Sequence, residues 1–505
     1  MTQQATIERE LKLGAWPGFE LPDLRGALNG IVPGAVQEWR LEAVYFDTSD
    51  LRLLRRGVTL RFRRGEEPGD LWTAKLPEST PALGMSRREI SVAAGPASMP
   101  TVLEDLVRGW ALGAPLAPVA RLRTLRNRTT LRKPDGQAVA VVDDDEVSII
   151  QRSRVAARFR ELELELLDGA SPKLMDRLSK RVRSAGAQPV EQIPKLVRAL
   201  GPSALAPWDL APPQLSPTPT AAELLTAALT RSAARLVDHI AVVVLDEDME
   251  GVHQSRVAIR TLRSDLRTAG PLLDKTAVEP LRRDLDWLMS SLGEVRDLDV
   301  LLARLGEDIQ RLEPADRPAA SLVLEQARQD RAAAYERLRA DLRTPRCAAL
   351  LQETALIAAD PPLRSRRARK PAPSVLPRLV RGPVEDLRRE VKKQGQTPDD
   401  DAMHRIRIRT KRARYAAELA APATTGKARK SARKLAGVQD LLGDHHDACV
   451  AVLALRDLGA RTGQSGAWAC GLLGGLAVAR AAECRTRFAS VWRDATARKH
   501  WRWTG

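Results

Sequence analysis

The chain has 505 residues, of which 44% are hydrophobic, and its mean hydropathy is −0.28. This composition excludes a disordered chain, and the length predicts two or three domains rather than one core. Lys and Arg number 81 against 64 Asp and Glu, which gives a net charge of +17 and a pI of about 10.2. Such a surface attracts polyanions, so nucleic acid, anionic lipid and phosphate polymers are the partner classes to separate.

The sequence contains neither a secretory signal nor a membrane-spanning segment. Its most apolar stretch, residues 467–478, has about 12 residues, whereas a helix needs about 20 to span a bilayer. Glu8 and Glu10 stand where a secretory signal would be apolar. The four cysteines, at positions 347, 449, 470 and 484, form no C-x-x-C pair and no metal-binding spacing. We therefore expect a soluble, cytoplasmic protein without a disulfide framework or a membrane partner.

Residues 1–200 form the first predicted domain, and short segments of alternating polar and apolar residues dominate it. A period of two is typical of β-strands. Two stretches, Met99–Leu112 and Pro172–Ala185, have helical periodicity instead. The alternating segments are residues 6–13, 44–64, 71–76, 86–92, 138–150 and 159–167.

The predicted strands carry their charged residues on one face. Glu8, Glu10 and Lys12 alternate with Leu11 and Leu13, so charged and apolar side chains point to opposite sides. One such strand is commonly amphipathic and faces water, but six with both signs of charge favour a closed sheet with the charges inside. Carboxylates crowded in such a tunnel need a hard cation such as Mg²⁺ or Mn²⁺, and basic residues would neutralise a triphosphate. The other charged residues in this pattern are Arg61, Arg63, Lys75, Arg87, Glu89, Asp143, Asp145, Glu161, Glu163 and Glu165.

Residues 4–200 resemble the CYTH family of triphosphate tunnel metalloenzymes. The resemblance rests on the E-x-E-x-K at residues 8–12 and the YFDT…LR-R segment at residues 45–63. The later TAK, R-x-E, ELELE and IPK motifs follow in the family order. The resemblance implies an α+β fold, with an antiparallel eight-stranded β tunnel barrel and flanking helices, and metal-dependent hydrolysis of a triphosphate.

The CYTH resemblance also implies roles for individual residues. The catalytic candidates are Glu8, Glu10 and Lys12. Glu8 and Glu10 would hold Mg²⁺ or Mn²⁺ with members of the ELELE motif, Glu161, Glu163 and Glu165, and which two of these three ligate stays open. The implied phosphate-binding residues are Lys12, Arg61, Arg63, Lys75, Arg87, Arg123, Arg126 and Lys195.

The rest of the chain is predicted to be all-helical and to contain an internal repeat. A Pro-rich linker, residues 201–220, precedes it, and a break at residues 361–377 separates copies at about 221–360 and 375–505. Residues 293–297 match residues 443–447, and Arg283 matches Arg433, at an offset of 150. The motif His253-x2-Arg256-x3-Arg260-x2-Arg263 returns 151 residues later as His404-x2-Arg407-x3-Lys411-x2-Arg414.

Each copy of this motif places its His and basic residues on one face of one helix. Like charges at these spacings destabilise a helix unless they face water or an anion. A solvated basic helix would explain one copy alone, but the repetition of both the His and the spacing favours an anion site. Arg296 in the first copy stands where the second copy has His446.

Residues 221–500 resemble the CHAD family, a helical domain named for conserved histidines. The resemblance implies an all-α domain of two pseudo-symmetric four-helix bundles that face a basic channel for inorganic polyphosphate. The implied channel residues are His253, Arg256, Arg260, Arg263, Arg283, His404, Arg407, Lys411, Arg414, Arg433 and His446.

The two resemblances together predict an inorganic triphosphatase, a metal-dependent phosphoanhydride hydrolase, joined to a polyphosphate-binding module. Its expected partners are inorganic triphosphate, polyphosphate and polyphosphate granules. Nucleic acid is disfavoured, because Tyr and Phe are few (three and five) and the basic helices lack interleaved aromatic residues that could stack on bases. Three alternatives stay open: a class IV-type adenylate cyclase, a thiamine or nucleoside triphosphatase, and a non-catalytic protein that targets polyphosphate granules.

Overall fold

The computed structural model describes residues 3–25, 30–65, 69–77, 85–96, 98–167, 169–190, 193–247, 249–395, 398–497 and 500–504. The side chains of residues 3–9 and 85–87 lie outside this description. The chain divides into two compact units, Met1–Trp208 and Asp209–Gly505, and the division falls within the Pro-rich segment 201–220.

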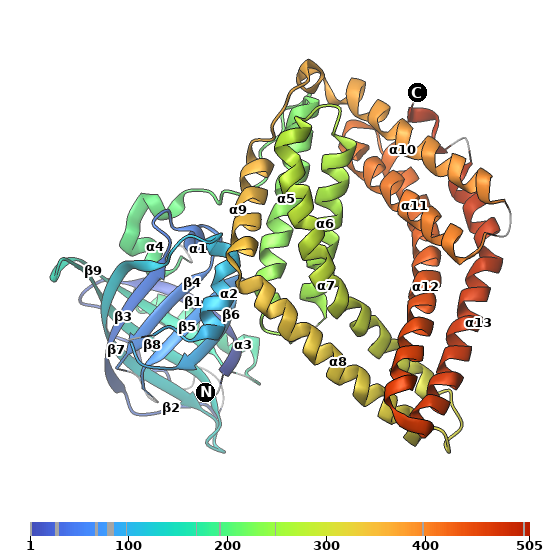
Figure 1. The fold of residues 1–505 in the computed structure, drawn as a ribbon. Coiled ribbons are helices and arrows are strands. Elements are labelled where there is room, and N and C mark those ends of the chain that lie inside the picture. Colours follow the sequence, from blue (N-terminus) through green and yellow to red (C-terminus); the bar gives the residue numbers. More distant parts are fainter. Residues whose placement is uncertain are drawn as a thin grey trace. The chain divides into compact units, whose positions relative to one another are not determined.

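The first unit is built on a closed antiparallel β-barrel (Figure 1). Its strands follow one another in the order β1-β6-β5-β4-β3-β7-β8-β9, and β1 pairs again with β9. Strand β1 makes both pairings because it is long: residues 3–10 pair with β6 and residues 9–15 with β9. The predicted eight-stranded antiparallel barrel is therefore confirmed in the part of the chain that the structure describes. The strands are β1 (Gln3–Ala15), β3 (Gln37–Asp47), β4 (Thr59–Arg64), β5 (Leu71–Pro77), β6 (Met85–Ala93), β7 (Ala117–Arg132), β8 (Ala138–Gln151) and β9 (Arg154–Leu166), and the short β2 (Val32–Pro33) and β10 (Gln188–Pro189) pair with β7 and β1.

Residues 44–64, which the sequence analysis treats as one alternating segment, are divided in the structure by the short helix α1 (Arg52–Arg55). The carboxylate of Asp47 organises this turn. It accepts hydrogen bonds from the backbone N–H groups of Thr48, Leu53 and Leu54 at 2.7, 3.0 and 2.9 Å. Helix α1 contacts β3 and β4 and packs against α2 (Thr101–Ala111), which corresponds to the predicted helix at Met99–Leu112.

A second helix covers another part of the outer surface of the barrel. Leu174, Leu178 and Val182 recur along one side of α3 (Pro172–Ser184) and pack in one cluster with Leu162 and Leu164 of β9. Because side chains alternate along a strand, the glutamates on either side of these leucines point into the barrel. The cover by α3 thus explains why the charged face of β9 lies inside.

One end of the barrel interior is filled by helix α4 (Lys195–Leu200), which the sequence analysis did not predict. Leu196 and Val197 are buried in one apolar cluster with Leu122 and Val147. Leu122 and Val147 lie on the inward faces of β7 and β8 by strand alternation. Lys195, the first residue of α4, is therefore carried into the interior of the barrel. The 3-10 helix η1 (Gly201–Leu205) follows α4.

The second unit is helical, and its helices repeat in order. Helices α5–α8 of the first half correspond to α10–α13 of the second half, with related lengths (Figure 1). Helix α9 has no counterpart among the residues that the structure describes. The helices are α5 (Ala221–Val243), α6 (Glu250–Thr268), α7 (Lys275–Ile309), α8 (Arg317–Arg343), α9 (Pro345–Ala359), η2 (Arg366–Arg369), α10 (Ala372–Gln394), α11 (Asp400–Ala420), η3 (Ala421–Ala423), α12 (Lys427–Arg461), α13 (Gly463–Thr496) and η5 (Arg502–Thr504).

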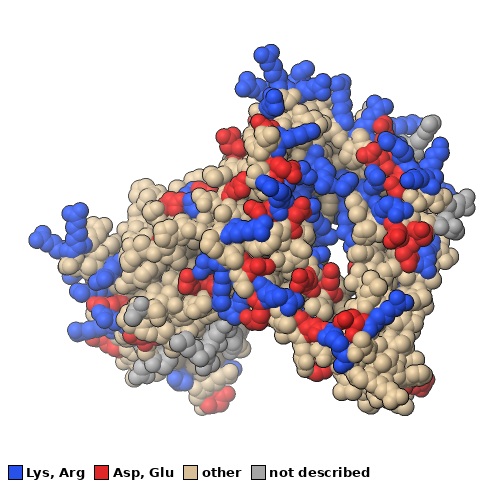
Figure 2. All heavy atoms as spheres, in the orientation of Figure 1, with Lys and Arg blue, Asp and Glu red and all other residues tan. Residues whose placement is uncertain are grey.

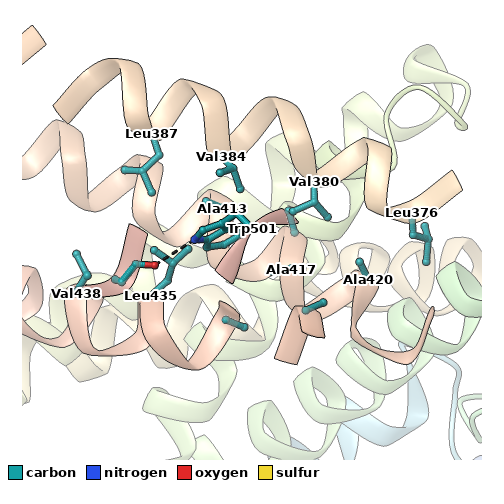
Figure 3. Packing of buried hydrophobic residues seen from close by; sticks show 14 of the residues in the cluster. Leu376, Val380, Val384, Leu387, Ala413, Ala417, Ala420, Leu435, Val438 and Trp501 are labelled. Atoms are coloured by element: carbon teal, nitrogen blue, oxygen red, sulfur yellow. Dashed lines mark hydrogen bonds between the residues drawn. The ribbon is translucent and has the colours of Figure 1, made fainter. Parts of the chain in front are cut away.

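The core of the second half lies between α10, α11 and α12. One side of α10 presents an apolar row that faces the small residues of α11 (Figure 3). Trp501, close to the C-terminus, completes this core, and its indole Nε1 donates a hydrogen bond to the carbonyl of Ala495 at 3.1 Å. The residues labelled in this core are Leu376, Val380, Val384, Leu387, Ala413, Ala417, Ala420, Leu435 and Val438.

The two halves also share a core. Leu301 and Leu305 of α7 belong to one apolar cluster with Leu455 of α12 and Leu473 of α13. Helices α7 and α8 of the first half and α12 and α13 of the second half bury their apolar sides against one another in this cluster. The two halves are therefore joined by a common core rather than independent. The predicted break at residues 361–377 is shorter in the structure, because α10 begins at Ala372. Among the described residues, no helix combines the length and the apolarity needed to cross a membrane.

Candidate functional site

The barrel encloses a cavity of about 210 Å³. Its lining combines carboxylates and cations from seven strands with the start of α4. Eleven of the lining residues were singled out from the sequence, whereas Tyr45, Thr59, Arg128 and Pro194 were not. The predicted members are Glu10, Lys12, Arg61, Arg63, Lys75, Arg126, Glu163, Glu165 and Lys195, together with Glu89 and Asp143, to which no role was given.

The acidic wall of this cavity is formed where β1 meets β9. The strand register places Glu10 beside Glu165 and Lys12 beside Glu163. The Nζ atom of Lys12 lies 2.8 Å from Glu163 Oε1 and 3.5 Å from Glu10 Oε1. Glu161 Oε1, on the same face of β9, lies 3.9 Å from this Nζ atom, so strand alternation on two adjacent strands gathers three carboxylates around one ammonium group.

Lys195 enters the same acidic wall from α4. Its Nζ atom lies 2.7 Å from Asp145 Oδ2, 2.9 Å from Glu163 Oε1 and 3.1 Å from Glu161 Oε1. Burial acts to lower the pKa of Lys195, but the negative charges of these carboxylates raise it well above its usual range. Burial acts to raise the pKa of Glu163, but Lys12, Lys195 and Arg126 hold it well below its usual range. Both groups thus stay charged inside the barrel.

The basic wall lies on β4 and β5. Arg61 and Arg63 alternate with apolar residues along β4, and Thr59 pairs with Lys75 of β5 in the strand register. The Nζ atom of Lys75 lies 3.1 Å from Glu89 Oε2. Although burial acts to raise it, the pKa of Glu89 falls to about 2 because of Lys75 and the two arginines.

The pKa of Tyr45 reflects the positive charge at this wall. Its side chain is buried, and burial alone raises the pKa of a phenol. The charge of Arg61 and the hydrogen bond to Arg61 outweigh burial and lower the pKa of Tyr45. The field in this part of the cavity is therefore positive enough to stabilise a buried anion.

Arg126 does not belong to the basic wall. Its guanidinium forms a two-pronged ion pair with Asp145, at 2.7 and 2.6 Å, and lies 2.7 Å from Asp143 Oδ2 and 2.9 Å from Glu163 Oε2. Next to it, Arg128 forms a two-pronged pair with Asp143 at 2.7 and 2.7 Å. Arg126 is thus surrounded by carboxylates and helps to hold the acidic wall together.

The structure does not bring Arg123 into the cavity. It lies three residues before Arg126 on β7, so the two side chains point to opposite faces of the strand. The Arg123 side chain is 60% exposed, and its Nε lies 3.0 Å from Glu42 Oε1 on the outside of the barrel. Its prediction as a residue of the cavity is wrong on this geometry.

Glu161 also lies outside the cavity lining, although it shares the inward face of β9. It is fully buried behind Lys195, and its carboxylate oxygens accept no hydrogen bond from the residues that the structure describes. Besides Lys195, Arg198 Nη1 lies 3.3 Å and Lys12 Nζ 3.9 Å from it. The side chains of Glu8 and Arg87 lie outside the description, and their backbones pair with each other in the β1–β6 ladder.

In the helical unit, α6 contacts α11, and the two copies of the repeated motif lie on these helices. Figure 2 shows an opening through this unit, with Lys and Arg atoms gathered along its upper edge. We call the residues gathered by their mutual electrostatic effects the basic cluster. They are His253, Arg256, Arg260, Arg296, His404, Arg407, Lys411 and His446.

The basic cluster is crowded enough to shift its own proton equilibria. Burial and the charges of Arg407, Arg260 and Arg256 lower the pKa of Lys411 to about 7. Burial and the charges of Arg407, His404 and Lys411 lower the pKa of His446 to about 3. The Nδ1 atoms of His404 and His446 are 3.3 Å apart.

Two carboxylates of the repeated motif, Asp297 and Asp447, occupy equivalent positions beside the basic cluster. Burial is the main cause that raises the pKa of both, and Asp297 further raises the pKa of Asp447. They balance only part of the positive charge, since Arg256 Nη2 is 3.8 Å from Asp297 Oδ1. Both belong to the repeated motif, and no role was predicted for either of them.

The other predicted channel residues are not gathered in the same way. Arg263 forms an ion pair with Asp286, and Arg414 Nε lies 2.9 Å from Glu418 Oε1, one turn along the same helix. Arg283 is exposed on α7. Arg433 lines a separate groove of about 300 Å³ together with Arg414. These four residues are therefore not part of the basic cluster.

A closed antiparallel barrel with internal acidic and basic walls, followed by a two-copy helical unit with a basic cluster, defines a two-domain protein class. The CYTH domain model matches residues 6–195, and the CHAD domain model matches residues 227–456. The uncharacterized protein Rv2226 of Mycobacterium tuberculosis H37Rv is 31% identical over 434 residues, which cover 81% of this chain and 80% of the relative. The chain belongs to the family of proteins that join a CYTH domain to a CHAD domain.

Two solved structures resemble part of the chain. The CHAD domain from the plant Ricinus communis is 25% identical, with a TM-score of 0.48, and the match covers 58% of this chain and 97% of that one. PptA from Streptomyces chartreusis is 22% identical, with a TM-score of 0.46, and the match covers 55% of this chain and 99% of that one.

Proposed function

We propose that the barrel hydrolyses the phosphoanhydride bond of inorganic triphosphate, with Mg²⁺ or Mn²⁺ as cofactor. The observation that carries this proposal is the division of one cavity into an acidic wall, with Glu10, Glu163 and Glu165, and a basic wall, with Arg61 and Arg63. A hard divalent cation suits the first wall and the charged oxygens of a triphosphate suit the second.

The residues of the acidic wall fit a hard metal ion, because every donor is a carboxylate oxygen. Glu10 and Glu165 are neighbours across the β1–β9 ladder, and Glu163 lies one alternation further along β9. We assign the metal to these three residues and leave Glu161 out, because it does not line the cavity. The bound cation would neutralise phosphate charge and lower the pKa of a coordinated water.

The side chains of the chain itself would position the substrate. Arg61, Arg63 and Lys75 would spread the negative charge that develops on the transferring phosphoryl group. Lys12 and Lys195, held charged by their carboxylate neighbours, would fix the orientation of Glu163. Arg126 has a positioning role, since it contacts the carboxylates rather than the basic wall.

The size of the cavity supports an inorganic substrate over an organic triphosphate. A volume of about 210 Å³ is below the about 300–1,000 Å³ that is usual for pockets of drug-sized ligands. A bare triphosphate chain can lie wholly inside, whereas the adenosine of ATP or the thiamine of thiamine triphosphate would have to remain outside.

We further propose that the basic cluster of the helical unit binds inorganic polyphosphate. The support is the mutual repulsion of its cations. Burial and the neighbouring positive charges lower the pKa of Lys411 and of His446, and a bound polyanion would offset this repulsion. Affinity that rests on many phosphate contacts falls steeply with salt. Nucleic acid is the competing polyanion, and equal binding of polyphosphate and single-stranded DNA at physiological salt would contradict this proposal.

One panel of substrates tests the catalytic proposal. The purified full-length protein is given tripolyphosphate, ATP, thiamine triphosphate and long-chain polyphosphate with Mg²⁺ or Mn²⁺, and phosphate and cyclic AMP are measured. We expect the highest kcat/KM on tripolyphosphate and no cyclic AMP. Absence of turnover with every substrate and both metals would leave only a non-catalytic, polyphosphate-targeting role.

A further inference from the structure

A group of three possible metal ligands lies outside both sites, where α11 begins beside α12. His445 and Cys449 are one turn apart on α12, so they share a face of the helix, and Asp400 is the first residue of α11. The ligand atoms of the three side chains all lie within 4.8 Å of one another. His445 Nε2 is 3.0 Å from Asp400 Oδ1 and 3.9 Å from Cys449 Sγ.

These distances are close to the edges of a tetrahedral metal site. With Zn–S bonds of about 2.3 Å and Zn–N or Zn–O bonds of about 2.0–2.1 Å, tetrahedral angles place N and S about 3.5 Å apart and N and O about 3.4 Å apart. The observed separations of 3.9 and 3.0 Å differ from these by roughly half an ångström. The Asp400 oxygen and Cys449 Sγ lie within 4.8 Å of each other, so metal binding requires the three side chains to close up by rotation.

The pseudo-symmetric position in the first half is already occupied by a cation. The residue equivalent to Cys449 is Asp299, whose Oδ1 lies 3.0 Å from Arg331 Nε. The same guanidinium donates to Asp246 in the segment before α6, with both bonds at 2.6 Å. Arg331 thus ties the start of α6 to α7 and α8.

The second half has no arginine at the corresponding position. At the offset of 150 residues that relates the two halves, Ala481 stands where the first half has Arg331, and Asp400, His445 and Cys449 lie close together there. Arg485, one turn further along α13, donates to Asp400 Oδ1. The Asp400 side chain is 58% exposed, so it can turn its other carboxylate oxygen toward the histidine and the thiol while it keeps this contact.

We propose that Asp400, His445 and Cys449 bind one divalent transition-metal ion of the zinc class, with water as the fourth ligand. A donor set of one carboxylate, one imidazole and one thiolate suits such an ion and disfavours Mg²⁺. The thiol proton is released to solvent when Sγ coordinates the metal. The ion links the start of α11 to α12, as Arg331 links the equivalent helices in the first half.

The proposed metal lies next to the basic cluster. His404 follows Asp400 by one helical turn, and His446 directly follows His445, so the ion would hold the two helices that carry the His404–His446 pair. This site is separate from the cavity of the barrel, which offers hard oxygen ligands, and its test does not depend on hydrolysis.

Co²⁺ is the probe for this site, because a Co²⁺–thiolate bond gives a charge-transfer absorption in the near ultraviolet. The full-length protein is titrated with Co²⁺. Residues 1–208 contain no cysteine, so Co²⁺ in the barrel cannot give this absorption. We expect the absorption to saturate at one equivalent, to be displaced by Zn²⁺, and to persist in excess Mg²⁺.

Variants assign the ligands. We expect Cys449→Ser to abolish the absorption, and His445→Gln or Asp400→Asn to raise the Kd for Co²⁺ at least about tenfold. Cys470→Ser, which changes a cysteine in the core shared by the two halves, is the matched control and keeps the absorption. An absorption that is absent in the wild type, or that survives Cys449→Ser, overturns the proposal.

A second measurement needs no variant and therefore does not depend on how the mutants fold. Thiol alkylation of the wild-type protein is followed residue by residue by mass spectrometry, with and without Zn²⁺. We expect Zn²⁺ to slow the modification of Cys449 at least about tenfold while leaving Cys347 unchanged. Equal rates at Cys449 with and without Zn²⁺ contradict the site.

Discussion

Nζ of Lys12 lies 2.8 Å from Oε1 of Glu163, its partner across the ladder that closes the barrel. Lys195 and Arg126 contact the same carboxylate at 2.9 Å each. This one glutamate is therefore a shared partner of three cations, from β1, α4 and β7. Its removal should affect both the stability of the barrel and the shape of the cavity.

We predict that Glu163→Gln lowers the free energy of unfolding by about 3 kcal/mol or more, because it leaves buried cations without their shared partner. The pKa of Glu163 is depressed in the folded state, so its stabilisation is complete above the unfolded-state pKa and is lost as the pH falls through the folded-state value. The difference between wild type and variant should thus be constant near pH 7 and shrink only in strong acid. Urea unfolding at several pH values measures it, and Glu42→Gln on the outer surface is the matched control, with an expected cost below about 1 kcal/mol.

The second prediction separates catalysis from polymer binding. Glu10→Gln removes one charge from the acidic wall, so we expect turnover of tripolyphosphate to fall at least about 100-fold, the loss of one metal or charge-stabilising group. Binding of long-chain polyphosphate should be unchanged, because Glu10 lies in the barrel. Phosphate release and a filter-binding assay give the two readouts; normal turnover in Glu10→Gln would refute the assignment of the acidic wall.

The complementary variant changes the basic cluster. Arg260→Ala combined with Lys411→Ala should weaken long-chain polyphosphate binding and flatten its salt dependence, because two phosphate contacts are lost. Tripolyphosphatase activity should stay at the wild-type level. The control with the same loss of charge is Arg328→Ala combined with Arg389→Ala, two exposed arginines in local ion pairs. If the control weakens binding equally, net charge rather than the cluster governs affinity.

Lys411 should make polyphosphate binding depend on pH. In the unoccupied protein its pKa is about 7, and a bound polyanion raises it, so binding takes up a proton above that pH. Affinity is therefore expected to fall as the pH rises from 7 to 9. Lys411→Arg keeps its charge over this range and should bind with little dependence on pH, which isothermal titration in buffers of different ionisation enthalpy can measure.

Asp265 on α6 should be a position where removal of charge stabilises the fold. It is buried, and burial together with the nearby charge of Glu418 raises its pKa well above the usual range, against a smaller effect of Arg231. Stability is therefore highest below the unfolded-state pKa and is lost as the pH rises through the folded-state value. Asp265→Asn should raise the free energy of unfolding by roughly 1 kcal/mol at pH 8, with no gain near pH 4.

The parts of the fold that depend on a repeating pattern of residues within one strand or helix could be predicted from the sequence. Alternation along β1, β4 and β9 located the charged face of the barrel, and the return of the His-x2-Arg motif located the two halves of the helical unit. Both signals depend only on spacing along one element. The same rule would have excluded Arg123, since a separation of three residues from Arg126 places the two on opposite faces of a strand.

The remaining details depend on contacts between elements that spacing does not encode. Glu161 and Glu163 share one face of β9, and only the insertion of α4 buries the first and leaves the second at the cavity. Arg128 lies at the cavity because of its register against Asp143 on β8. The possible metal ligands His445 and Cys449 are one turn apart on α12, and the third, Asp400, comes from α11. Neither the His445–Cys449 spacing nor the position of Asp400 is conspicuous in the sequence alone.

Helix α4 makes the barrel a blind pocket rather than a pore. On the proposed function, a linear phosphate polymer would be stopped by the apolar plug of Leu196 and Val197 and would offer only its terminus to the acidic wall. Cleavage would then shorten chains from their ends, and each released product would have to leave through the mouth by which the substrate entered.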